Sequence, residues 1–123
     1  MAPGKTPAFK PERAVPVRML AGDVDVFGDG AVKIVSTPGH TPGHQALVVR
    51  MKNTGYVLLS GDAVHFKDNW ENRRVPSMNT SKEQTLASLE RIAGLMKELG
   101  AQLWINHDKA QGDAAKRPPA FYD

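Results

Sequence analysis

The sequence contains no cysteine among its 123 residues. Disulfide bonds and thiolate metal ligands are therefore excluded, and any metal site in this chain must be built from imidazole and carboxylate groups. Histidine is also scarce, and the four that are present are His40, His44, His65 and His107. The search for a metal site can be confined to these four residues and the acidic residues near them.

Long apolar runs are absent as well. No segment approaches the roughly 20 apolar residues that a helix needs to span a bilayer. The first residues, MAPGKTPAFKPER, hold no apolar stretch of the kind found in signal peptides. We therefore expect a cytoplasmic protein. Residues 1–14 are rich in proline and basic side chains, which favours a flexible N-terminal segment ahead of a folded part from 15 to 123.

Charge of one sign does not dominate the chain. Sixteen Lys and Arg against 13 Asp and Glu give a net charge of +3, without a dense basic stripe interleaved with aromatic residues. This distribution argues against nucleic-acid binding. The pair Arg73-Arg74 is typical of a solvated turn. Apolar residues at 41% and charged residues at 24% are typical of a globular domain with one core.

Short β-rich runs fill the first half of the chain and predict strands. These strands are expected at residues 15–20, 24–27, 31–36, 45–51 and 56–60. Gly28-Asp29-Gly30 predicts a tight turn that makes a hairpin of the strands on either side of it. Asn53-Thr54-Gly55 predicts a second turn between the last two strands.

The pattern then becomes helical over residues 81–99, where apolar side chains recur every three or four positions. Either Thr80 with Glu83 or Ser81 with Gln84 can cap its start, and Gly100 can end it. Residues 102–106 predict a short final strand that delivers His107 at its end. Residues 108–123 are mostly polar and, with Pro118-Pro119, do not favour a long helix.

The densest chemical signal is the loop TPGHTPGH, residues 37–44, between two predicted strands. Each Pro fixes φ and each Gly permits a positive φ, so the loop can be rigid and tightly curved. Such a loop can hold an imidazole at the fixed angle that a metal ligand needs. The alternative is a surface turn with two solvated histidines.

Two further segments place polar residues at the ends of apolar strands. LLSGD ends in Asp62, and LWINHD contains His107. Read singly, the first is also typical of a turn and the second of a surface position. Together with the loop they supply His, Asp and His, a donor set that suits Zn²⁺, Fe²⁺ or Mn²⁺. An iron oxygenase with two histidines and one carboxylate could use the same donors, whereas no serine-hydrolase or dinucleotide motif is present.

The segments STPGHTPGHQALVV, VLLSGDAVHF and LWINHD, in this order, resemble the second half of the metallo-β-lactamase superfamily. Gln45 and the stretch NWENRRVPSMN are most similar to the N-acyl homoserine lactonase group, and the resemblance covers residues 15–123. It implies an α/β fold that is half of an αββα sandwich. The sheet should be mixed or antiparallel, with the helix at 81–99 packed on it.

The resemblance also implies a role for each candidate residue. His40 and His107 match metal ligands, and Asp62 matches a carboxylate that bridges two metal ions, Zn²⁺ or else Fe²⁺ or Mn²⁺. His44 matches a position that supports the ligands by hydrogen bonding without touching the metal. His65 stands where some relatives carry a tyrosine that contacts the substrate, so it is expected in the wall of the site.

Relatives carry a His-x-His-x-Asp-His motif upstream, and this sequence has no histidine before His40. The first hypothesis is therefore a metal-dependent hydrolase, acting on a lactone or ester through metal-bound hydroxide, that is present here as one half. Its activity would need a complementing amino-terminal half, and no complete catalytic set lies in this chain. The alternative is an inactive truncated domain that self-associates as a homodimer and binds at most one metal ion.

Overall fold

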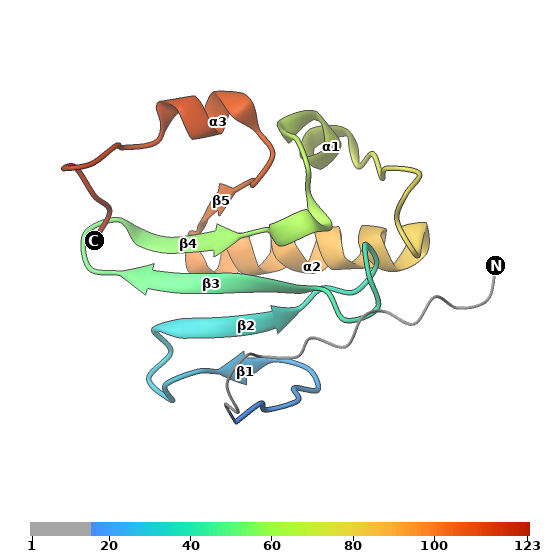
Figure 1. Cartoon of the computed structure of the whole chain (residues 1–123), viewed down its shortest axis with the longest axis horizontal. Helices are drawn as coiled ribbons and strands as arrows, with labels where there is room; N and C mark the ends of the chain where they lie inside the picture. Colours follow the sequence, from blue (N-terminus) through green and yellow to red (C-terminus); the bar gives the residue numbers. More distant parts are fainter. Residues whose placement is uncertain (1–15) are drawn as a thin grey trace.

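The computed structural model describes residues 16–123, so the predicted N-terminal segment lies outside the described residues. Five strands form one sheet in the order β1-β2-β3-β4-β5, antiparallel except for the parallel pair β4 and β5 (Figure 1). The expected mixed α/β architecture is confirmed. The elements are β1 Val24–Asp25, β2 Val32–Ser36, β3 Gln45–Met51, β4 Gly55–Leu59, a 3₁₀ turn η1 Gly61–Ala63, α1 Lys67–Asn72, α2 Lys82–Leu99, β5 Gln102–Trp104 and α3 Lys109–Ala114.

The central strands form where the sequence predicts them, but the first strand does not. Residues 16–20 form no strand and are mostly exposed, and β1 has only two residues. The shortness of β1 follows from the aspartate side chains around it. The carboxylate of Asp25 accepts hydrogen bonds from the backbone N–H groups of Gly28 and Gly30, and Asp23 accepts one from Ser36. These local bonds replace the ladder that a longer strand would need.

Helix α2 is capped as one of the two expected patterns predicts. The hydroxyl of Ser81 accepts a hydrogen bond from the backbone N–H of Gln84, and Gly100 ends the helix in the left-handed conformation, with φ of 64°. The helix covers one face of the sheet (Figure 1). Its Ile92 is buried in the main core with Val48 and Leu58 of the sheet.

The parallel pairing of β4 and β5 decides where the chemistry-bearing residues lie. The chain leaves β4, passes through α1 and α2 and returns as β5 (Figure 1). Because parallel strands end at the same edge, the segments after β4 and β5 meet there. The sequence patterns missed the helices α1 and α3, which have six residues each. That length is too short for an apolar periodicity to develop.

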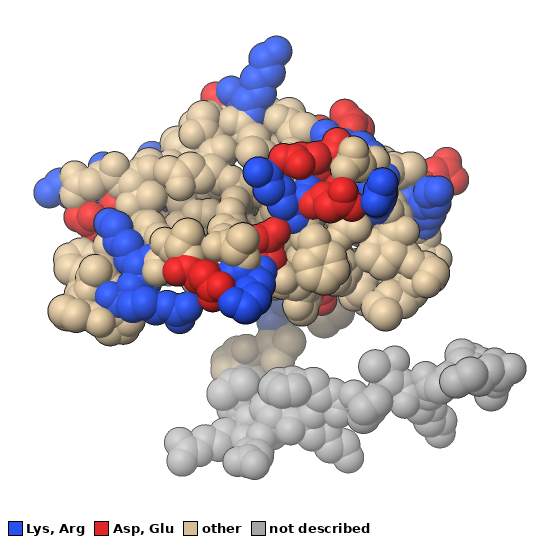
Figure 2. Space-filling model, turned by 90° about the horizontal axis from the view of Figure 1, so that it is seen from above, with Lys and Arg blue, Asp and Glu red and all other residues tan. Residues whose placement is uncertain are grey.

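Charges of both signs are interspersed on the face shown in Figure 2. Arg73 closes α1 with φ of 52°, pairs with Glu90 at 2.9 Å and stacks on Trp70 at 4.3 Å from the ring centre. Arg74 pairs with Asp68 at 3.1 Å. Both arginines therefore engage the protein at an exposed turn. Within residues 16–123, no helix has the length and apolar character needed to cross a membrane.

Candidate metal centre

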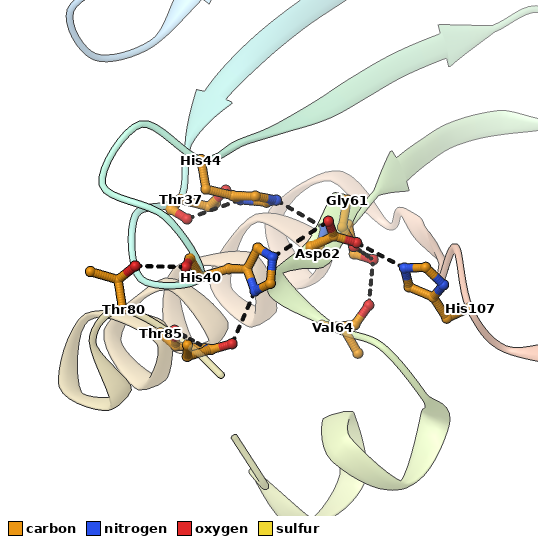
Figure 3. A network of polar contacts seen from close by, with 11 residues as sticks. Thr37, His40, His44, Gly61, Asp62, Val64, Thr80, Thr85 and His107 are labelled. Atoms are coloured by element: carbon orange, nitrogen blue, oxygen red, sulfur yellow. Dashed lines mark hydrogen bonds and ion pairs between the residues drawn. The ribbon is translucent and has the colours of Figure 1, made fainter. Parts of the chain in front are cut away.

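Three of the predicted residues converge at the edge where β4 and β5 end. Asp62 lies in η1 directly after β4, His107 follows β5, and His40 comes from the loop between β2 and β3. The Nε2 atom of His107 is 2.9 Å from Oδ1 of Asp62, and that of His40 is 3.6 Å from Oδ2. Figure 3 shows the two imidazoles approaching the carboxylate from opposite sides. Residues far apart in the sequence therefore share one carboxylate.

The conformation of the TPGHTPGH loop depends on Gly39. This residue has φ of 141°, and a Cβ atom there would lie 2.2 Å from Oγ1 and 2.4 Å from the backbone N of Thr85. Only glycine lets the loop lie directly on the first turn of α2. Gly43 differs from the expectation, because its φ is not positive and a Cβ atom would meet nothing within 4 Å.

The ring of His40 is oriented by Asn79, a residue that the sequence motifs did not single out. Nδ1 of His40 is 3.0 Å from Oδ1 of Asn79, and the amide Nδ2 of Asn79 donates to Oγ1 of Thr85 at 2.7 Å. That hydroxyl in turn donates to the carbonyl of Ser81 at 3.0 Å. This chain of bonds assigns the proton of His40 to Nδ1 and leaves the Nε2 lone pair facing Asp62.

His44 uses both ring nitrogens inside the protein. Nε2 accepts a hydrogen bond of 2.9 Å from the backbone N–H of Asp62, and Nδ1 lies 3.1 Å from the carbonyl oxygen of Thr37. Burial lowers the pKa of His44, so the ring is neutral at neutral pH. Gly61 accommodates it, because a Cβ atom there would lie 2.8 Å from Nε2. His44 therefore holds the backbone of Asp62 and has no lone pair left for a metal.

The electrostatics of the cluster favour an ionised carboxylate. The hydrogen bond from His107 lowers the pKa of Asp62, and the nearby imidazoles add to this effect when they are charged. The side chain of Asp62 is 40% exposed and that of His107 is 53% exposed, whereas that of His40 is 18% exposed. The site is therefore open to solvent on the His107 side and closed on the His40 side.

His65 lies between the other two rings. Its ring centre is 5.2 Å from that of His40 and 5.3 Å from that of His107, on which it stacks at 13°. Nδ1 of His65 is buried without a hydrogen-bond partner among the described residues. Burial also lowers the pKa of His65, which keeps the imidazole neutral. The structure thus places all four histidines around Asp62.

The arrangement fits a divalent cation. Asp62, His65 and His107 each offer a ligand atom, and these atoms lie within 4.8 Å of one another. Neutral imidazoles and a carboxylate are donors suited to Zn²⁺, Fe²⁺ and Mn²⁺. A buried nitrogen without a partner, as in His65, is the kind of group that a cation can satisfy.

Comparison with known proteins identifies the class. The family model described as the metallo-beta-lactamase superfamily matches residues 1–99, and the chain belongs to this superfamily. Among curated relatives, the N-acyl homoserine lactonase AttM of Azorhizobium caulinodans is 35% identical over 99 residues, which are 80% of this chain and 38% of AttM. The N-acyl homoserine lactonase AiiA of Bacillus thuringiensis subsp. kurstaki is 32% identical over 85% of this chain and 40% of its own.

Solved structures agree with the sequence matches. An N-acyl homoserine lactone hydrolase, with N-hexanoyl-L-homoserine bound at its catalytic metal center, superimposes with a TM-score of 0.77 and 32% identity. The match covers 86% of this chain and 41% of that one. A probable metal-dependent hydrolase from Staphylococcus aureus, at 14% identity and a TM-score of 0.62, shares the fold. The chain thus spans about 40% of the length of the lactonases it matches.

Proposed function

We propose that His40, Asp62 and His107 bind a divalent metal ion, Zn²⁺, Fe²⁺ or Mn²⁺. On this proposal, they form one half of the site of a hydrolase that opens lactones or related esters. The observation that carries this proposal is the approach of two imidazole Nε2 atoms, from opposite sides, to the two oxygens of one carboxylate. Separate strand ends supply the three groups, as in a site built for a shared ligand.

The relatives support the substrate class. AttM and AiiA are N-acyl homoserine lactonases, and a solved relative holds an acyl homoserine at its metal center. Because this chain covers about 40% of their length, the activity of a whole enzyme needs further ligands. The upstream His-x-His-x-Asp-His motif implied by the resemblance would supply them from a complementing amino-terminal half.

Each residue has a defined task in this proposal. Asn79 keeps the proton of His40 on Nδ1 so that Nε2 can act as a ligand, and His44 fixes the backbone of Asp62. The exposed side of His107 admits water and substrate. A bound ion would polarise the lactone carbonyl and make a water molecule acidic enough to lose a proton near neutral pH.

A second candidate function is suggested by the sheet. The face opposite α2 carries apolar side chains that are only partly buried, namely Val32, Ile34, Leu47, Val49 and Leu59. An apolar face of this kind favours association. The chain could then be an inactive domain that pairs with a second copy through this face and binds at most one metal ion.

Metal titration tests the first proposal directly. We expect the chain to bind Zn²⁺, and Asp62→Asn to weaken binding by more than about 100-fold, because the substitution removes the charge shared by both imidazoles. Asp68→Asn, on the exposed face of α1, is the matched control and should bind Zn²⁺ normally. If Asp62→Asn binds Zn²⁺ as tightly as the unmodified chain, the proposal is wrong.

The rate of lactone hydrolysis and the oligomeric mass in solution distinguish the two candidate functions. Hydrolysis of N-hexanoyl homoserine lactone should be negligible for the chain alone and should rise when the amino-terminal half of a lactonase relative is added. A dimeric mass at micromolar concentration, with no gain in turnover on that addition, would favour the self-associating domain. A monomeric mass would rule the self-associating domain out.

A further inference from the structure

His65 is the histidine that the proposed function leaves without a task at the metal. It follows Asp62 by three residues, and its ring lies between those of His40 and His107. No hydrogen bond of the described residues involves its side chain, and its Nδ1 atom is shielded from solvent. A buried polar atom without a partner is destabilising because it has lost its hydrogen bonds to water. This unpartnered atom belongs to the ring that lies between His40 and His107.

The tightest group of donors includes His65 and leaves out His40. Ligand atoms of Asp62, His65 and His107 lie within 4.8 Å of one another. Oδ1 of Asp62 faces His107, whereas Oδ2 faces His40. The carboxylate thus presents one oxygen to each side, and the group of three donors joins His65 with His107 and not with His40.

We infer that His65 is a direct ligand, so that Asp62, His65 and His107 together bind one divalent ion within this chain. The inference deepens the proposed function and rests on it, because it uses the same carboxylate and the same His107. It adds a donor that does not depend on the upstream motif. His40 remains opposite Oδ2 on the far side of the carboxylate.

Only a small movement is needed to close the site. Donor atoms about 2.0–2.2 Å from one ion are roughly 3–3.5 Å apart. The ligand atoms of Asp62, His65 and His107 lie within 4.8 Å of one another, so the widest spacing must contract by at most about 2 Å. His107 can supply this movement, because its side chain is 53% exposed and Asp62 is its only hydrogen-bond partner among the described side chains. Its ring already stacks on that of His65, at 13° between the planes.

The test is titration of the full chain with Zn²⁺ and with Co²⁺, whose visible absorption reports the ligands directly. We expect His65→Phe to lower Zn²⁺ affinity by at least about tenfold and to change the Co²⁺ spectrum. Phenylalanine keeps a ring in the same place but has no nitrogen. Phe66→Leu, at the next and half-exposed position, is the control and should leave affinity and spectrum unchanged.

Stability of the metal-free proteins separates a ligand from a structural residue. Replacing His65, whose Nδ1 atom is buried without a partner among the described residues, by phenylalanine should leave the metal-free chain at least as stable as before, while metal binding falls. If His65→Phe retains wild-type affinity and the same Co²⁺ spectrum while Asp62→Asn does not bind, the inference is overturned and the proposed function stands. If the unmodified chain binds neither ion, both fail.

Discussion

The two sides of Asp62 are built in different ways. On one side, His40 is 18% exposed, its Nδ1 is tied to Asn79, and its loop is pressed on α2. On the other side, His107 is 53% exposed, follows a strand of three residues, and has Asp62 as its hydrogen-bond partner. One ligand is therefore oriented in advance, and the other can adjust.

This difference shows where rigidity comes from in a small domain. The loop that carries His40 has no regular secondary structure, yet hydrogen bonds fix both its backbone and its side chains. The carbonyls of Gly39 and His40 accept hydrogen bonds from the backbone N–H groups of Ser81 and Thr80. Preorganised ligands lose less entropy on binding, whereas an exposed ligand allows entry and exchange.

The largest effect should come from a substitution of Gly39, which disrupts the rigid loop that carries His40. Gly39→Ala places a Cβ atom against the backbone of Thr85 and forces alanine into a conformation with φ of 141°. We expect the free energy of unfolding to fall by about 2–4 kcal/mol. Urea denaturation measures it. Gly43→Ala, in the same loop but in open space, should cost less than about 1 kcal/mol; equal losses for the two variants would contradict the comparison.

The next effect concerns the orientation of His40. Asn79→Leu removes the acceptor for Nδ1, so the proton of His40 can move to Nε2, and Zn²⁺ affinity should fall by about 10- to 100-fold. Asn79→Asp keeps an acceptor oxygen and should restore most of the affinity. Nitrogen chemical shifts of the His40 ring report which nitrogen carries the proton. Unchanged shifts in Asn79→Leu would show that Asn79 does not set the tautomer.

Features that depend on local sequence patterns were predicted well. Motif order and apolar periodicity located the central strands, the helix α2 and the strand ends that carry His40, Asp62 and His107. These features depend on local patterns of polar and apolar residues, which are visible along the chain. The expected family and fold class were confirmed.

Other features depend on contacts between distant segments and could not be predicted in this way. Asn79 contacts His40 across 39 positions in the sequence, and nothing in its neighbourhood marks it. The shortness of β1 depends on side-chain bonds from Asp23 to Ser36 and from Asp25 to the turn after it. His65 was expected in the wall of the site, but its position between the rings of His40 and His107 depends on the turn after β4, which local patterns do not specify.

Substitutions on the His107 side of Asp62 should change Zn²⁺ affinity less than substitutions on the His40 side. Gln111 holds the segment before His107, because its Nε2 donates to the carbonyl of Leu103 at 2.7 Å and its Oε1 accepts from the backbone N–H of Ile105. Gln111→Ala should lower the free energy of unfolding by about 1–2 kcal/mol. Zn²⁺ affinity should change less than in Asn79→Leu. A larger loss of affinity in Gln111→Ala would mean that the His107 side is the preorganised one.

The smallest effect is a pH dependence that originates on the rigid side. Burial lowers the pKa of His44 below its ordinary value of 6.5. The unfolded chain therefore takes up a proton at a higher pH than the folded chain. The stabilisation is complete above about pH 6.5 and is lost as the pH falls toward the folded pKa.

In the presence of a chelator, urea denaturation at pH 7.5, 6.5 and 5.5 should thus give a falling free energy of unfolding. His44→Gln removes the titrating group and should flatten this slope. His65, whose pKa burial also lowers, would supply the slope that remains. If the free energy of unfolding of the unmodified chain rises on acidification over this range, His44 is not held neutral by its buried bonds to Thr37 and Asp62, and the rigid side of the site does not depend on them.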